Sequence, residues 1–210
     1  MRRSLLLEAG LEVFGTRGYA SSSVLEICQQ AGLTERYFYE SFTDREALLS
    51  AVASAIVEDF LTAVAPLAML TETHLDRAIR EGADAFVASL ADDPRRARVL
   101  LVETVGVSPT MEDRRRAVIG EIVEFLRRGT GLRYGSSVSD SVQFDVVTRA
   151  LVGAAQELLV AFVRRELPID REQLTAQLAG LFRSAPTILM ALSESAGESA
   201  QNHTEKETPR

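Results

Sequence analysis

One short segment, from Thr34 to Arg45, concentrates hydroxyl and guanidinium side chains that can bond nucleic acid. Arginine can form two hydrogen bonds with guanine, and hydroxyl groups can bond phosphate oxygens. Arg36 is therefore the strongest candidate for reading a base. At 3.6 residues per turn, Phe38 and Phe42 share one helix face and are expected to anchor it to a core. The alternative, a helical segment that only packs, stays open on spacing alone.

Other chemistry is poorly supplied. A Ser-His-Asp triad would rest on His74 alone, because the second histidine, His203, lies in a polar tail. No Cys and His residues cluster at zinc-ligand spacing, and no GxxxxGK[ST] phosphate loop occurs. Residues 129–135 miss the dinucleotide fingerprint by one residue and follow a helical pattern instead of a strand. We expect no catalytic residue, no metal and no cofactor.

The elements that would position Arg36 form a helix-turn-helix pattern. Ser23 and Glu26 have the spacing of a capping box that opens a short helix. Gly32 supplies a turn, and Thr34 can cap a second short helix over 35–41. Such hairpins are common in proteins that bind no DNA, so the pattern alone leaves both interpretations open.

Helices are also expected on both sides of this hairpin. The preceding helix carries an apolar stripe and stops at Gly15 and Gly18. The following helix opens with a capping box at Thr43-Asp44-Arg45-Glu46 and runs toward Val64, where Pro66 ends or kinks it.

The rest of the chain is expected to be helical as well, which makes the fold class all-α. Apolar periodicity and caps predict helices at about 74–90, 95–106, 110–128, 138–166 and 171–193. A Gly/Ser-rich loop is expected at 129–137, and Pro186 is expected to kink the last helix. Residues 194–210 show no apolar period and are expected to be a disordered tail.

Composition describes a globular chain without an obvious DNA signal. The 210 residues are 46% hydrophobic and 25% charged, with a net charge of −7. No run approaches the roughly 20 consecutive apolar residues of a membrane span, so no membrane partner is expected. Cys28 is the single cysteine, which points to a reducing, cytoplasmic compartment. Residues 1–50 hold five arginines and seven acids, so we expect modest non-specific DNA affinity.

Residues 3–52 resemble the DNA-binding domain of the TetR family of bacterial transcriptional regulators. The matching motifs are Val13-Phe14, Gly18-Tyr19, Ser22-Ser23-Val24, Glu26-Ile27, Ala31-Gly32-Leu33-Thr34, Tyr39, Phe42, Arg45-Glu46 and Leu48-Leu49. The sequence departs from the family pattern at Leu25, often basic or polar, at Cys28, commonly Ala, and at Arg45, usually Lys.

The resemblance implies a role for each polar residue of this domain. Thr34, Arg36 and Tyr37 would lie at the major-groove end of the recognition helix. Contacts to phosphate would come from Ser22, Ser23, Tyr39, Ser41 and Arg45. The implied domains are a three-helix helix-turn-helix domain over 1–50 and a larger helical ligand-binding and dimerisation domain over 51–193.

The larger domain would form a homodimer through the helices at about 138–166 and 171–193. A two-fold dimer would place two recognition helices about 34–36 Å apart and bind a pseudo-palindromic operator. A mostly apolar pocket with few polar anchors would hold a small-molecule effector. Its candidate lining residues are Phe60, Phe86, Glu103, Phe125, Phe144 and Gln156.

These expectations together describe a ligand-responsive transcriptional regulator, usually a repressor in this family, that a small apolar ligand releases from DNA. The alternative from another functional class is a helical-bundle carrier or enzyme for a small molecule, with a vestigial helix-turn-helix. A protein-interaction adaptor is a third possibility. Site selection from random DNA separates the first from the other two.

Overall fold

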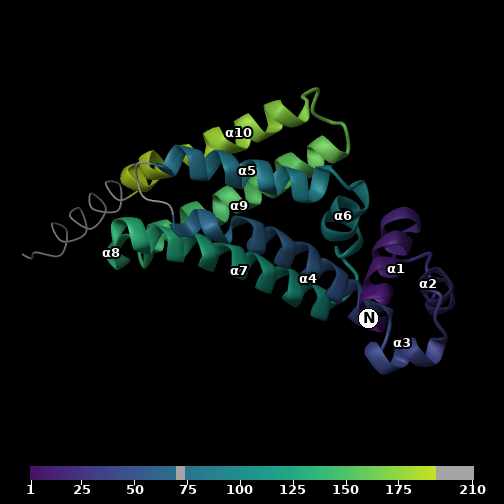
Figure 1. Ribbon diagram of the computed structural model, residues 1–210. Helices are drawn as coiled ribbons and strands as arrows, with labels where there is room; N and C mark the ends of the chain where they lie inside the picture. The colour runs from purple at the N-terminus through teal and green to yellow at the C-terminus, as the bar shows by residue number, and fades with distance from the viewer. Residues whose placement is uncertain (70–73, 193–210) are drawn as a thin grey trace, which may run out of the picture.

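The computed structural model describes residues 1–69 and 74–192 of the chain. Within these ranges it contains helices and no strand, which confirms the all-α prediction. Figure 1 shows α1, α2 and α3 gathered at one end, and a larger bundle formed by the later helices. The elements are α1 (Arg2–Arg17), α2 (Val24–Ala31), α3 (Glu35–Ser41), α4 (Arg45–Val64), the 3₁₀-helix η1 (Ala65–Met69), α5 (Leu75–Ala91), α6 (Pro94–Arg98), the π-helix η3 (Val99–Glu103), α7 (Pro109–Tyr134), α8 (Ser136–Ser139), α9 (Val142–Val163) and α10 (Arg171–Arg183).

The N-terminal lobe contributes several large side chains to an apolar core that continues into the rest of the chain. Leu6 and Phe14 of α1, Ile27 of α2, Phe38 of α3 and Leu48 of α4 are all fully buried. Burying one such side chain stabilises a fold by about 1.5–3 kcal/mol. The stripe expected along the first helix and the inward face of Phe38 therefore fix how these short helices pack.

Two of the expected helix caps differ from the structure. Ser23 caps α2 as expected, because its Oγ accepts from the Glu26 N–H. Asp44, and not Thr43, caps α4: its Oδ1 accepts from the Ala47 N–H at 2.7 Å. Thr34 precedes α3 but makes no side-chain cap hydrogen bond.

The loop expected at 129–137 is largely helix. α7 continues to Tyr134, and the chain turns at Gly135, whose φ of 85° favours glycine. Gly131 lies inside α7, where α8 packs closely against it. A Cβ at this position would lie 3.1 Å from the Ser139 Oγ. The glycine thus permits a close approach between helices, a role that composition does not distinguish from a turn.

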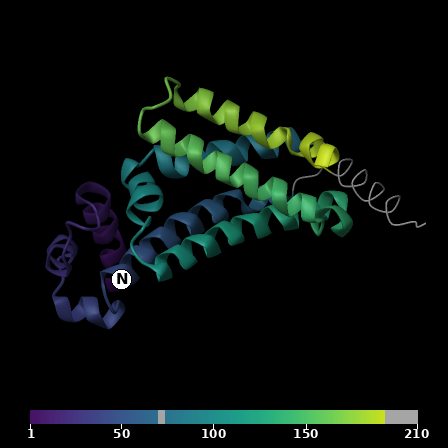
Figure 2. The same ribbon diagram turned by 180° about the vertical axis from the view of Figure 1, so that it is seen from behind.

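The C-terminal lobe packs around α4, α5, α7 and α9. Figures 1 and 2 show α4 and α7 side by side, with α10 lying along α5. α9 is shorter than the expected 138–166, and α10 breaks at Ser184, after which residues 185–192 are helical again. The expected helix at 95–106 is α6 followed by the π-helix η3. The tail at 194–210 lies outside the described residues.

Two helices, over Arg45–Leu67 and Val142–Val163, are long and apolar enough to span a membrane by length and composition. Such a test is also passed by core helices of folded domains, and both helices contribute to the core here. Leu48, Val52 and Ile56 of α4 and Leu159 of α9 are buried.

The two lobes are closely joined. α1 packs against α6 so tightly that a Cβ on Gly15 would lie 2.8 Å from the Arg95 Cα. Arg95 also pairs with Glu12 of α1 at 2.6 Å and with Asp93 at 2.7 Å. The domain boundary expected after residue 50 falls inside α4, which runs through both lobes.

Candidate nucleic-acid interface and ligand cavity

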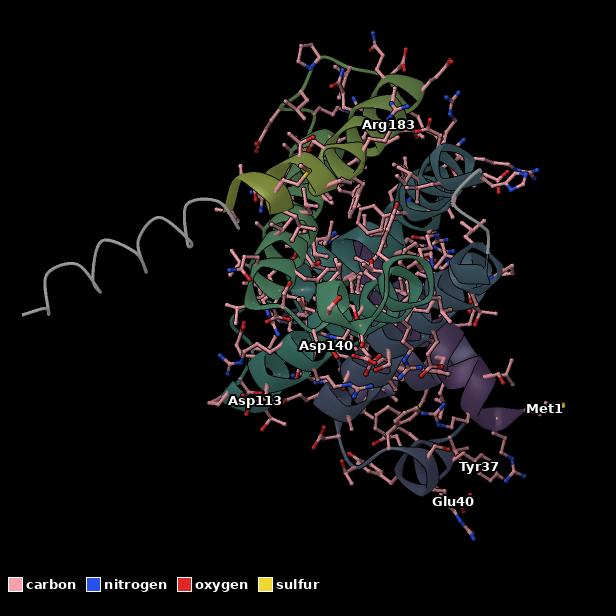
Figure 3. All side chains as sticks on the ribbon, turned by 90° about the vertical axis from the view of Figure 1, so that its left-hand side faces the viewer. Met1, Tyr37, Glu40, Asp113, Asp140 and Arg183 are labelled. Atoms are coloured by element: carbon pink, nitrogen blue, oxygen red, sulfur yellow. The ribbon has the colours of Figure 1, made fainter. Side chains whose placement is uncertain are left out.

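The outer face of α3 presents the residues expected to contact DNA. The Arg36 side chain is 84% exposed and Tyr39 is 57% exposed, and Thr34 is also exposed. Tyr37 and Ser41 are half-buried at the flanks. Figure 3 shows Tyr37 and Glu40 at the end of the molecule that also carries Met1. The helix is therefore held by its aromatic face and leaves a polar face free to approach a partner.

An acidic residue organises the basic groups on this face. Arg36 Nε donates to Glu40 Oε1 at 3.1 Å, and Arg2 Nη1 lies 3.7 Å from Glu40 Oε2. The Arg2 guanidinium also lies over the Tyr37 ring, 3.9 Å from its centroid. Exposed pairs of this kind are weak, so Arg36 can leave Glu40 for a base at little cost.

Ser22 and Arg45 lie in a different environment from the rest of the expected DNA contacts. Arg45 Nη1 donates to the Tyr19 carbonyl at 3.0 Å and to the Ser22 carbonyl, and the guanidinium lies over the Tyr19 ring. Ser22 is buried, and its Oγ donates to the Tyr19 carbonyl at 2.7 Å. Both side chains tie the loop before α2 to α4.

Ser23 has a capping role whether or not it touches phosphate. Its Oγ donates to Glu26 Oε2 at 2.9 Å while accepting from the Glu26 N–H. This Ser23 hydroxyl, followed by Arg17, holds the pKa of Glu26 below its usual value. The start of α2 is therefore a compact polar corner in the element that packs against α3.

A small cavity of about 70 Å³, partly open to the surface, lies between α4, α5, η3, α7 and α9. Phe60 and Phe86 line it, with their ring centroids 5.5 Å apart in an edge-to-face arrangement, and Gln156 lies on the wall formed by α9. The other lining residues are Ile56, Val57, Ser89, Leu90, Leu100, Leu101, Arg115, Val118, Ile119, Ile122 and Val152. An apolar wall with a few polar groups suits a largely apolar ligand.

Arg115 is the charged lining residue that sequence reasoning missed. Its Nε donates to Glu112 Oε2 at 3.2 Å, one turn earlier on α7. The Gly106 N–H and then Arg115 hold the pKa of Glu112 below its usual value. The signal was present in the helical spacing of Arg115, Val118 and Ile122, which puts the arginine on the apolar face of α7.

Three residues expected to line the cavity lie elsewhere. Glu103 accepts from the Tyr19 N–H at 2.7 Å and so lies at the junction of the two lobes. Phe144 is buried under the Arg127 guanidinium, 5.3 Å from its ring centroid. Phe125 is half-buried on α7 and is not part of the cavity wall.

The geometry of an aromatic-anchored, capped helix-turn-helix agrees with a family match. Residues 6–52 match the family described as bacterial regulatory proteins, tetR family. Residues 6–52 are therefore the part of this chain that carries the likeness to the TetR family. TetR-family regulators bind DNA and a small-molecule effector, and they work as dimers.

The proteins to which this chain is similar are transcriptional regulators. The HTH-type transcriptional activator FasR of Mycolicibacterium smegmatis is 23% identical over 175 residues, covering 81% of this chain and 76% of its own. The fatty acid degradation regulator FadR of Bacillus halodurans has a TM-score of 0.74 at 16% identity, covering 90% of this chain and 94% of its own. FadR of Bacillus subtilis, in complex with stearoyl-CoA, has a TM-score of 0.74 at 18% identity, covering 87% and 98%.

The outer side of α9 exposes a face of apolar and small residues. Val142, Val146, Ala150 and Gly153 recur at helical spacing and are all exposed, with Val142 at 74%. Their apolar or small side chains would let another helix approach closely. The face lies within the segment that the sequence predicts to dimerise.

Proposed function

We propose that this chain is a cytoplasmic, ligand-responsive repressor that binds a pseudo-palindromic operator as a homodimer. The observation that carries the proposal is the sharing of α4 between the two sites. Ile56, Val57 and Phe60 of α4 line the cavity, while Arg45 at its start holds the loop before α2. One helix thus connects the volume of the cavity with the position of the DNA-binding helices.

A long-chain acyl thioester is the ligand class best supported. The cavity wall is mainly apolar, with Arg115 and Gln156 able to meet a polar head. The FadR relative of Bacillus subtilis was crystallised with stearoyl-CoA. A cavity of about 150 Å³ can hold benzene, so the 70 Å³ found here must widen before an acyl chain enters.

This size difference supports release by ligand. If the closed cavity accompanies operator binding, then a ligand that fits only an opened cavity shifts the population away from that state. The homodimer would place its two α3 helices about one DNA turn apart, so a small change in spacing would cost much affinity. Repression follows when the operator overlaps a promoter.

The first experiment is selection of binding sites from a random DNA pool with the purified full chain at stated salt. We expect a pseudo-palindromic motif. Arg36→Ala is expected to weaken binding to that motif by about 1–3 kcal/mol and to relax one base position. Arg77→Ala is the matched control, because Arg77 pairs with Glu81 on α5 and lies in the other lobe.

Two outcomes would contradict the proposal. Failure to enrich any site at low salt would remove DNA binding and favour the carrier or enzyme alternative. Equal loss of affinity in Arg36→Ala and Arg77→Ala would show that binding depends on overall charge and not on the recognition helix.

A further inference from the structure

One turn in the cavity wall is wider than an α-helical turn. η3 is a π-helix, and its residues Leu100 and Leu101 line the cavity. The Thr104 Oγ1 donates to the Leu100 carbonyl at 2.9 Å, which ties the residue after the turn back to the cavity wall. Such turns are rare and are often found at functional sites. A change of this turn to ordinary α-helical winding would move the residues that follow it.

The same segment ends at Glu103, whose carboxylate forms a hydrogen bond with the N-terminal lobe. Glu103 accepts from the Tyr19 N–H at 2.7 Å and from Arg98 Nε at 2.9 Å, and its side chain is only 13% exposed. Arg98 Nη1 in turn donates to the Thr16 carbonyl at 2.7 Å. We call Thr16, Tyr19, Arg98 and Glu103 the junction cluster. Hydrogen bonds to ionised groups shielded from water are stronger than neutral ones.

The end of α1 is shaped to receive the junction cluster. Gly18 has a φ of 93°, and a Cβ on it would lie 3.0 Å from Arg98 Nη2. Tyr19 is in turn bonded to the start of α4 and to the loop before α2, because its carbonyl accepts from Arg45 and from Ser22. Figure 1 shows α6, which leads into η3, lying directly beside α1. A path of direct contacts therefore runs from the cavity wall to the loop that begins the helix-turn-helix.

From this path we infer that Glu103 is a positioning residue for operator binding. With the cavity closed, Glu103 holds the turn after α1 and thereby fixes the lobe that carries α3. A ligand that displaces Leu100 and Leu101 lets η3 tighten into an α-helix. When the wide turn changes to α-helical winding, one residue fewer is needed per turn. The end of the segment then rotates by about 100°, which takes Glu103 away from Tyr19. The inference rests on the proposed function, since it explains how the cavity would control DNA affinity.

Because operator binding and ligand binding are thermodynamically linked, a coupling role for Glu103 affects the two affinities differently from a purely structural role. Removing the Glu103 contact should favour the open state, so operator binding weakens while ligand binding tightens. General destabilisation would instead weaken both. The full chain is tested as wild type, Glu103→Ala and Glu103→Gln. Glu81→Ala is the control, a carboxylate paired with Arg77 on α5, away from the junction cluster.

The measurements are operator affinity for the selected DNA site, affinity for stearoyl-CoA, and amide exchange of Tyr19 and of α9. Glu103→Ala is expected to weaken operator binding by about fivefold or more, the lower end of usual allosteric coupling. It should bind stearoyl-CoA at least as tightly as wild type and exchange the Tyr19 amide faster, with α9 unchanged. Glu103→Gln keeps an acceptor for Tyr19 but loses the charge for Arg98, so its effects should be intermediate.

Wild-type operator affinity in Glu103→Ala, or unchanged exchange at Tyr19, would overturn the inference. Faster exchange throughout α9 would also overturn it, because the residue would then act only on stability. If stearoyl-CoA binds neither protein, the ligand class of the proposed function fails, while operator affinity and exchange still decide the role of Glu103. If the wild type selects no DNA site, the proposed function fails and takes the inference with it.

Discussion

The recognition end and the cavity end of this chain are built in opposite ways. Around α3, large aromatic side chains such as Phe14 and Phe38 are fully buried, and the short helices have little freedom to repack. Around the cavity, Phe60 and Phe86 are only half-buried and border empty space. The end proposed to bind DNA and the end proposed to bind ligand thus share α4 but differ in how completely their aromatic side chains are buried. From this contrast we expect that the cavity end can change shape while the helices around α3 keep their packing.

The largest test of this contrast is the same substitution at both ends. Phe38→Ala removes a fully buried ring and is expected to lower the free energy of unfolding by about 3–5 kcal/mol. Phe60→Ala should cost less, because its ring is half-buried at the cavity wall and fills that wall incompletely. Urea unfolding of both variants measures the difference.

The two variants should also differ in function. Phe38→Ala should lose operator binding along with its fold, whereas Phe60→Ala should keep the fold and enlarge the cavity. Equal losses of stability would contradict the contrast, because the cavity end would then be packed as tightly as the recognition end.

A smaller effect is expected at the junction between the ends. Gly15→Ala places a methyl group against the backbone of Arg95, and overpacking of this kind costs about 1–3 kcal/mol. Gly120→Ala is the control, because a Cβ on this helical glycine of α7 meets nothing within 4 Å. That change should stabilise the chain by about 0.5–1 kcal/mol. Thermal unfolding should show opposite shifts; a rise in Tm for Gly15→Ala would contradict the close packing of α1 on α6.

Local signals predicted much of the fold. The caps at Ser23, Asp93, Ser108 and Asp170 act within a few residues, so their spacing is visible in the sequence, and each begins a helix in the structure. The outward face of α3 followed from the inward face of Phe38 in the same way. These features depend on one helix at a time.

Features that depend on contacts between distant segments were not predictable. The sequence predicts a loop at Gly131, because it does not show that Ser139 packs against this glycine. Glu103 was assigned to the cavity because it interrupts an apolar run, yet its partner, Tyr19, is 84 residues away in the chain. The phosphate contact of Arg45 stays a prediction, and its contacts to the carbonyls of Tyr19 and Ser22 were not foreseen. No periodicity records which helix a polar side chain will meet.

The most direct test of the account is a titration of stearoyl-CoA into the complex of wild-type protein and its selected operator, followed by fluorescence anisotropy at fixed salt. We expect ligand binding to open the cavity and release the DNA, with at least about a fivefold loss of operator affinity at saturation. Calorimetry on the protein alone would establish that the ligand binds. Bound ligand with unchanged operator affinity would contradict the coupling between cavity and recognition helix.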